Sequence, residues 1–175
     1  MNRNDRFSWL QNPGLLFGLL VAAAFALFSP AIGHEFINYD DNLYVYKNVH
    51  VLHGFSRDGF SYAFQSIDGA SWMPLTWLSL MLDAALYGPG PAGYHFTNIL
   101  LHALNAGLLF LVLQRMTQQT WCALLVAAIF AWHPQRLESV AWVAERKDVL
   151  SVFFFMLGLL AYLYYMARPG WRRML

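Results

Sequence analysis

Four long apolar stretches constrain this chain more than any other feature of its sequence. None of them contains Asp, Glu, Lys or Arg, and they cover residues 14–33, 93–114, 117–133 and 149–167. About 20 mostly apolar residues cross the hydrocarbon core of a bilayer. Only 12% of the 175 residues are charged, against about 25% in soluble domains. The sequence therefore predicts an all-α membrane protein with about four transmembrane helices. The first stretch could also be a signal peptide, but its length and its poor cleavage pattern favour an uncleaved anchor.

The segments between these stretches predict two polar outer loops, at residues 34–92 and 134–148. The longer loop contains a short apolar segment at 71–87 with Pro74 and Asp83 inside it. Its aromatic flanks are typical of a helix at the membrane interface. No period of about 34 residues is found, so we expect a single partial transmembrane domain over 1–175 without a repeat domain.

Arginine placement predicts the orientation, because Lys and Arg near spans favour the cytoplasmic side. A four-span arrangement puts both termini in the cytoplasm together with Arg3, Arg6, Arg115, Arg168, Arg172 and Arg173. A five-span alternative would export Arg115 and the C-terminal arginines. The net charge of +1, without a basic patch, excludes a nucleic-acid partner.

Two adjacent carboxylates, Asp40 and Asp41, follow the first span by a few residues. One interpretation is a pair of solvated surface charges. The flanking residues are aromatic and apolar, however, and neighbouring carboxylates beside low-dielectric material repel each other. The pair could then supply a general base, or it could bind a divalent cation through its oxygens. Both alternatives fit the residues.

The second span carries four polar side chains on one helical face, spaced by three, four and three residues: His95, Asn98, His102 and Asn105. Polar groups at membrane depth need partners, so this face should point into the bundle. We interpret Asn98 and Asn105 as interhelical hydrogen-bonding groups. His95 lies nearer the outer end and is a candidate substrate-binding residue.

The second outer loop combines three cations with acidic residues. Its pattern is typical of an amphipathic surface helix of mixed charge. The cations would also suit a lipid phosphate, because Arg binds phosphate bidentately and Lys supplies a point charge. The candidate binding residues in and beside this loop are His133, Arg136, Glu138, Arg146 and Lys147.

Together these segments resemble the N-terminal part of polytopic glycosyltransferases of the GT-C type. They are similar in particular to bacterial membrane proteins with tetratricopeptide repeats and to the transmembrane O-mannosyltransferases that carry such repeats. The resemblance runs from about residue 15 to 167 and is carried by Phe36–Asn42, Trp72–Ser79, Pro91–Asn105 and, most specifically, Phe130–Ser151.

The resemblance implies a partial GT-C-like bundle whose first outer loop holds the catalytic motif, at Asp40 and Asp41. It implies inverting transfer of a sugar, mannose or a similar one, from a polyprenyl-phosphate carrier to a protein hydroxyl. The cations would hold the departing phosphate, and Trp72 and Trp77 would seat the carrier lipid at the interface. It also implies the inner membrane of a bacterium.

The chain ends soon after the fourth stretch, whereas its relatives have more spans. We therefore expect a fragment that is inactive without missing segments or a second chain, so whether it acts as an enzyme by itself stays open. The alternative is a non-catalytic membrane scaffold or assembly partner. A small transporter fits less well, because the four spans show no internal duplication.

Overall fold

The computed structural model describes residues 12–68 and 71–167, which form a bundle of helices with no strand in these ranges. The protein is thus an all-helical membrane protein, as its apolar stretches predict. Three segments are long and apolar enough to cross a membrane: Pro13–Gly33, Pro91–Thr117 and Val143–Ala167. Of the six arginines used for the orientation, the structure describes Arg115. The other five, near the two termini, lie outside the described residues.

Helix α1 (Pro13–Phe28) begins at a well-formed cap. The side chain of Asn12 accepts hydrogen bonds from the backbone N–H groups of Gly14 and Leu15, at 2.9 and 3.4 Å. Pro13 occupies the first helical position, where its missing N–H costs nothing. A 3-10 helix, Ser29–Gly33, continues the segment toward the first loop.

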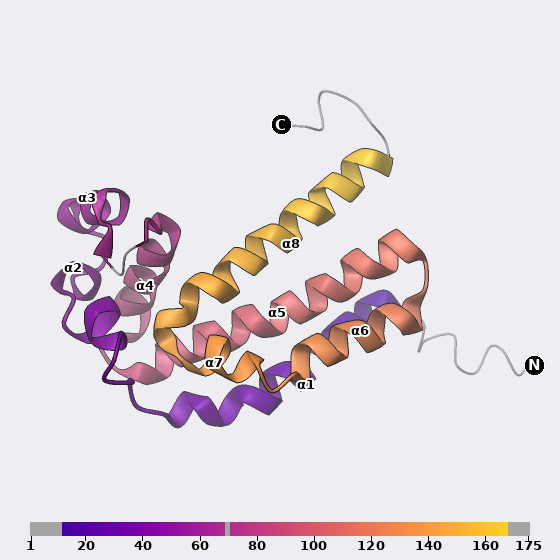
Figure 1. Cartoon of the computed structure of the whole chain (residues 1–175), viewed down its shortest axis with the longest axis horizontal. Coiled ribbons are helices and arrows are strands. Elements are labelled where there is room, and N and C mark those ends of the chain that lie inside the picture. The colour runs from indigo at the N-terminus through magenta and orange to yellow at the C-terminus, as the bar shows by residue number, and fades with distance from the viewer. Residues whose placement is uncertain (1–11, 69–70, 168–175) are drawn as a thin grey trace, which may run out of the picture.

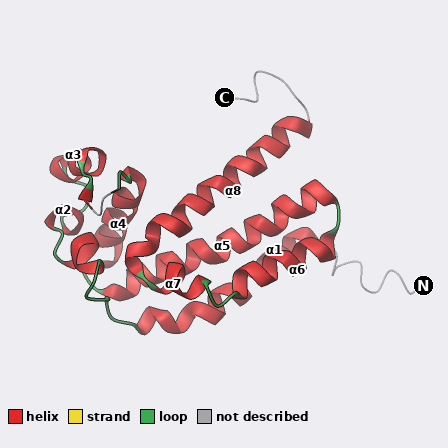
Figure 2. Ribbon diagram, in the orientation of Figure 1, coloured by secondary structure: helices red, strands yellow, loops and turns green. Residues whose placement is uncertain are grey.

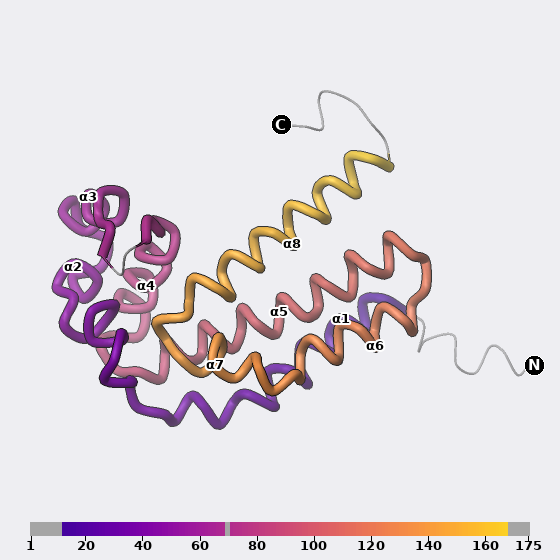
Figure 3. Tube along the Cα trace, viewed as in Figure 1, coloured from indigo at the N-terminus to yellow at the C-terminus, as the bar shows by residue number. Residues whose placement is uncertain are grey.

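Helix α5 (Pro91–Thr117) is the centre of the bundle and packs against α1, α6 and α8. Figure 3 shows that α1 and α6 run in one direction, while α5 and α8 run in the other. Helix α8 (Arg146–Ala167) leans away from α5 toward its C-terminal end (Figure 1). Most of the apolar surface of α8 is consequently exposed in this chain.

Helix α6 (Thr120–Trp132) is shorter than the other spans. Gln118 adopts a left-handed conformation (φ 58°) that ends α5. At the other end His133 is extended, as residues before a proline usually are. The 13 residues of α6 rise about 20 Å, against about 30 Å for a hydrocarbon core. The segment expected over 117–133 is therefore a short apolar helix.

The first loop is a small folded unit at one end of the bundle. It contains a π-helix (Asn42–Tyr46), α2 (Val49–Leu52), α3 (Arg57–Gln65) and α4 (Pro74–Tyr87), joined by short connections (Figure 2). Its own apolar core includes Tyr44, Val51, Trp77 and Leu80. The expected interfacial helix is thus α4, and its Trp77 side chain is fully buried in this core.

The second loop returns to the same core. It forms α7 (Arg136–Ala141) and a 3-10 turn (Val143–Glu145) before α8 begins at Arg146. Val143 and Ala144 belong to the apolar core of the first loop. The two loops, predicted separately, therefore form one structure at one end of the bundle.

The contact between α1 and α5 predicts a strong effect of one methyl group. A Cβ on Gly107 would lie 2.5 Å from Cε2 of Phe17 and 2.8 Å from Val21. Gly107→Ala should lower the free energy of unfolding by about 1–3 kcal/mol, as overpacking does. The matched control is Gly158→Ala on α8, whose added Cβ meets nothing within 4 Å. Denaturant titration in mild detergent measures both, and equal stabilities would contradict the close packing.

Candidate functional site

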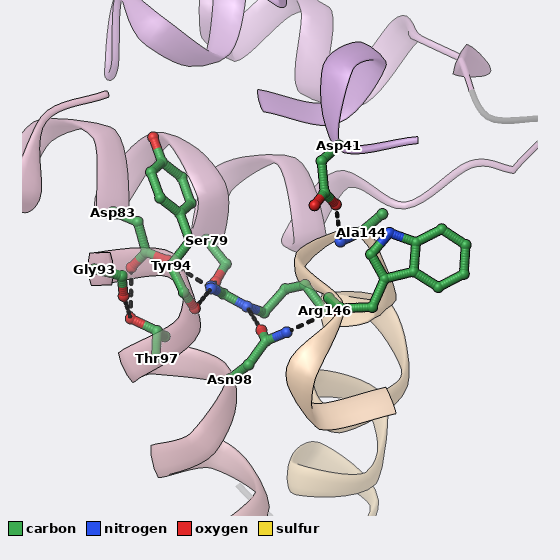
Figure 4. Close-up of polar contacts among 10 residues, drawn as sticks. Asp41, Ser79, Asp83, Gly93, Tyr94, Thr97, Asn98, Ala144 and Arg146 are labelled. Atoms are coloured by element: carbon green, nitrogen blue, oxygen red, sulfur yellow. Dashed lines mark hydrogen bonds and ion pairs between the residues drawn. The ribbon is translucent and has the colours of Figure 1, made fainter. Parts of the chain in front are cut away.

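Asp41 joins the two outer loops through its carboxylate, although its partners are far apart in sequence. Oδ2 accepts the backbone N–H of Ile37 at 2.8 Å, and Oδ1 accepts that of Ala144 at 2.9 Å (Figure 4). The residue is fully buried. Burial raises the pKa of the Asp41 carboxyl, while the two backbone N–H groups oppose that rise. Asp41 is thus held in place by donors from both loops.

Asp40 differs from its neighbour because its side chain is half-exposed. Its backbone carbonyl accepts the N–H groups of Leu43 and Tyr44, at 2.9 and 3.0 Å, where the chain enters the π-helix. Such π-helical turns are frequent at functional sites. The Asp40 carboxylate makes no hydrogen bond to the residues that the structure describes. Of the pair, Asp40 is therefore the carboxylate free to accept a proton or to bind a cation.

Tyr44 lies among the charged groups around the Asp pair. The Lys147 ammonium lies 5.8 Å from the centre of its ring. Burial raises the pKa of Tyr44, the positive charge of Lys147 lowers it, and the negative charges of Asp40 and Glu145 raise it. Lys147 also donates to Glu145 Oε1 at 2.7 Å. Tyr44 and Glu145 were not predicted from the sequence.

Arg146 is the most heavily bonded side chain of the region, and it is completely buried. Its Nη2 pairs with Asp83 Oδ2 at 2.6 Å and also donates to the carbonyl of Tyr94 at 3.0 Å. Its Nη1 donates to Ser79 Oγ at 2.6 Å, and its Nε donates to Asn98 Oδ1. The guanidinium thus ties α8 to α4 and α5 (Figure 4). Its donors are directed to protein acceptors, and it does not face an open surface.

Asp83 completes this network from α4. Its second oxygen, Oδ1, accepts the hydroxyl of Thr97 at 2.8 Å. A buried ion pair is tolerated when the remaining lone pairs and protons are also hydrogen-bonded, as here. The sequence signalled Asp83 only as a charge within an apolar helix, and it could not identify a partner 63 positions away.

Asn98 and Asn105 confirm their predicted role as hydrogen-bonding groups between elements. Asn98 Nδ2 donates to the carbonyl of Trp142 at 3.0 Å, and Asn105 Nδ2 donates to that of Val149 at 2.8 Å. Because Asn98 also accepts from Arg146, it links the ion pair to the segment that holds Ala144. The Arg146 network therefore fixes the backbone that donates to Asp41.

The other predicted binding residues are divided between buried and exposed positions. His95 is buried, and neither of its ring nitrogens makes a hydrogen bond of normal geometry within the part of the chain that the structure describes. Trp77 is buried against Tyr44 and Tyr62. Trp72 is exposed and donates to the carbonyl of Phe64 at 2.9 Å.

Three predicted binding residues in and beside the second loop, His133, Arg136 and Glu138, make no hydrogen bond to the Asp pair within the described residues. His133 and Glu138 are exposed. The Arg136 guanidinium lies 4.4 Å from the ring centre of Phe130 and lines a separate cavity of about 140 Å³ between α5, α6 and α8. Lys147 is the predicted cation that, together with Asp40, acts on the Tyr44 side chain. Among residues 12–68 and 71–167, no group of three or more His, Cys, Asp or Glu side chains could hold a metal ion.

Known proteins resemble this chain in sequence. It is 32% identical to protein O-mannosyl-transferase Tmtc1 of Drosophila melanogaster over 86% of this chain and 18% of the relative. The corresponding values for Drosophila Tmtc2 are 33%, 85% and 16%, and for human TMTC2 35%, 58% and 12%. The chain thus spans less than a fifth of these relatives. No family model and no solved structure matches. These relatives are eukaryotic, so they do not support the expected bacterial inner membrane.

The Arg146–Asp83 pair predicts a large and coupled loss of stability. Arg146→Met leaves the Asp83 carboxylate buried without its cation, which should cost about 3–5 kcal/mol of unfolding free energy. Arg146→Met combined with Asp83→Leu should cost less than the sum of the two single changes. Denaturant titrations in mild detergent give all terms of this cycle.

The matched control is Lys147→Met, next to Arg146 in sequence. Its pair with Glu145 is partly exposed, with 35% of the Lys147 side chain accessible. We expect this change to cost less than about 1 kcal/mol. Equal losses for Arg146→Met and Lys147→Met would contradict the structural role of the buried pair.

Proposed function

We propose, from the premise that this chain is a homologue of the TMTC-family protein O-mannosyl-transferases, that it supplies the base of a membrane mannosyltransferase. The donor would be mannose on a polyprenyl phosphate, and the acceptor a Ser or Thr hydroxyl of a protein. The observation that carries this proposal is the division of the Asp pair: Asp41 is fixed by both loops, and Asp40 is free beside it.

The reaction follows from the position of the free carboxylate. The acceptor hydroxyl oxygen attacks C1 of mannose, and its proton passes to the Asp40 carboxylate. The bond between C1 and the phosphate oxygen breaks, and its electron pair leaves with the phosphate. A single displacement from the opposite face inverts the anomeric configuration. Polyprenyl phosphate is a good leaving group, so no general acid is needed.

The remaining candidates take different parts in this proposal. Lys147 stabilises the negative charge that develops near Asp40, and Arg136, which lines a separate cavity, remains a predicted contact of the carrier phosphate. Arg146 and Trp77 are positioning residues, because both are buried among protein partners. Trp72 is exposed and contacts the carrier lipid. His95, His133 and Glu138 remain predicted substrate contacts, and a divalent cation at Asp40 remains a prediction.

The orientation also remains a proposal. The two loops and the turn at Gln118 lie at opposite ends of α5. We place the loops on the non-cytoplasmic side, with Arg115 and both termini in the cytoplasm and α6 as the fourth span.

The Asp40 proposal predicts loss of mannose transfer without loss of stability. Asp40→Asn removes the base but breaks no described hydrogen bond of that side chain, so transfer should fall at least about 100-fold. The assay follows labelled mannose from polyprenyl-phosphate mannose to a threonine peptide, in membranes that contain a complete homologous transferase carrying this segment, because we expect the chain alone to be inactive. Asp41→Asn is the comparison, because it places an amide group against the Ala144 or Ile37 N–H and should lower the melting temperature. Undiminished transfer by folded Asp40→Asn would reject the role of Asp40 as the base.

The orientation predicts which introduced cysteines react from outside. In a chain whose exposed Cys122 is replaced by Ala, Val49→Cys and Leu137→Cys should react with a membrane-impermeant maleimide in sealed vesicles with the non-cytoplasmic side outward. Gln118→Cys, at the other end of α5, should react only after detergent is added. Reaction of all three before lysis would contradict the four-span arrangement.

A further inference from the structure

The first loop carries a polar groove that the proposed reaction does not use. It consists of two adjoining cavities, of about 540 and 260 Å³, which share His50, Tyr62 and Asp68 in their walls. Because both cavities border the same three residues, we treat them as one continuous groove. It lies on the surface formed by α2, α3 and the π-helix.

One face of α3 supplies the larger part of this groove. Asp58, Ser61, Tyr62 and Gln65 line it, and their spacing of three, one and three places them on the same side of the helix. Phe60 and Phe64 lie on a different side, where their ring centres are 5.0 Å apart. The apolar side chains of α3 are therefore kept out of the groove, and its α3 wall is polar, while Leu43, Val49 and Ile67 line it from other segments.

The floor of the groove is fixed by hydrogen bonds around Tyr62. Its ring stacks on His50 with the centres 4.5 Å apart. Its hydroxyl donates to Asp68 Oδ2 at 2.7 Å and accepts from Asn48 Nδ2 at 2.8 Å. Asp68 and Asp58 are both exposed, so two carboxylates face solvent along this groove. Lys47 lines the smaller cavity, so the negative charge is concentrated in the larger one, where Asp58 and Asp68 favour a cationic, hydrogen-bonding group.

The smaller cavity leads back to the Asp pair. Asn42 lines it and directly follows Asp41. The Asn42 Oδ1 atom is buried and accepts no hydrogen bond in the part of the chain that the structure describes. In Figure 1, α2 and α3 lie at the end of the molecule away from most of the length of α1, α5, α6 and α8. The groove thus lies at the end of the molecule that is away from most of the length of the spanning helices.

We propose that this groove binds an extended polypeptide segment next to the acceptor hydroxyl, with a Lys or Arg side chain facing Asp58 and Asp68. The inference rests on the proposed function, which needs a protein acceptor at Asp40. An extended peptide presents N–H and C=O groups along its length, which Gln65, Ser61 and Asn42 can bond. The lipid donor then approaches from the bilayer, and the acceptor approaches from water.

The test measures peptide binding without any donor, using the full chain in phosphatidylcholine nanodiscs. The probes are a fluorescent eight-residue peptide of Gly, Thr and Lys and a matched peptide with Gln in place of Lys. Asp58→Asn combined with Asp68→Asn should raise the Kd of the Lys peptide about tenfold, which corresponds to about 1.4 kcal/mol. The amide that Asp68→Asn introduces keeps an oxygen for the Tyr62 hydroxyl, so the floor should remain folded, which a thermal melt checks.

Two matched controls test whether the Lys peptide binds in the groove. Arg57→Gln changes a neighbouring exposed charge on α3 that lies outside the groove walls, and it should leave the Kd within about twofold. A photo-crosslinking amino acid at position 65 should capture the Lys peptide, whereas the same group at position 64, on the Phe60 side, should not.

Each result bears on the groove or on the transferase separately. No saturable binding of the Lys peptide, equal binding by the Asp58→Asn, Asp68→Asn double variant, or capture of lipid instead of peptide at position 65 would overturn the groove. Because the binding assay needs no turnover, such results leave mannose transfer through Asp40 unaffected. Saturable binding in a chain whose Asp40→Asn variant transfers mannose normally would keep the groove and reject the proposed base.

Discussion

The buried guanidinium of Arg146 is the constraint on which the rest of the structure depends. A charge removed from water must find an opposite charge and must satisfy its remaining N–H groups, or the fold becomes unstable. Arg146 does so with acceptors from α4 and α5, so the first loop, the central helix and the start of α8 have to assemble together. The polar end of the bundle is therefore a single structure, although its parts come from distant segments of the chain.

This arrangement explains why two adjacent carboxylates behave differently. Asp41 receives the Ala144 N–H because Asn98 and Arg146 hold the backbone at Trp142 and Arg146. The Asp40 side chain, one residue earlier, is not bonded to these donors and keeps its oxygens free. A base must be accessible and yet fixed in space. Asp41, bonded to both loops, fixes the backbone that carries Asp40, the proposed base.

The sequence predicts the helices better than their contacts. Uninterrupted apolar residues identify α1, α5 and α8, and the polar spacing on α5 correctly identifies Asn98 and Asn105 as hydrogen-bonding groups. The pattern of Arg146 suggested a cation for phosphate, because its partner Asp83 lies 63 residues earlier and local spacing carries no information about it. Trp77 was assigned to the interface for the same reason, since only the folded loop shows that its ring is buried. The sequence likewise could not show that Asp41, and not Asp40, is the carboxylate that binds the second loop and that the Asp40 oxygens stay without a hydrogen bond among the described residues.

The bond between Asp41 and Ala144 also sets an order in time. A ribosome adds about 5–20 residues per second, so the 103 residues that separate the two partners take about 5–20 s to make. During this interval the first loop has left the ribosome, but its buried carboxylate has only the Ile37 donor and its ion pair has no arginine. The first loop therefore stays incompletely folded until α5, α6 and the start of α8 have been synthesised. The site thus forms only after the start of α8 has been made, and its most exposed period precedes the insertion of α8.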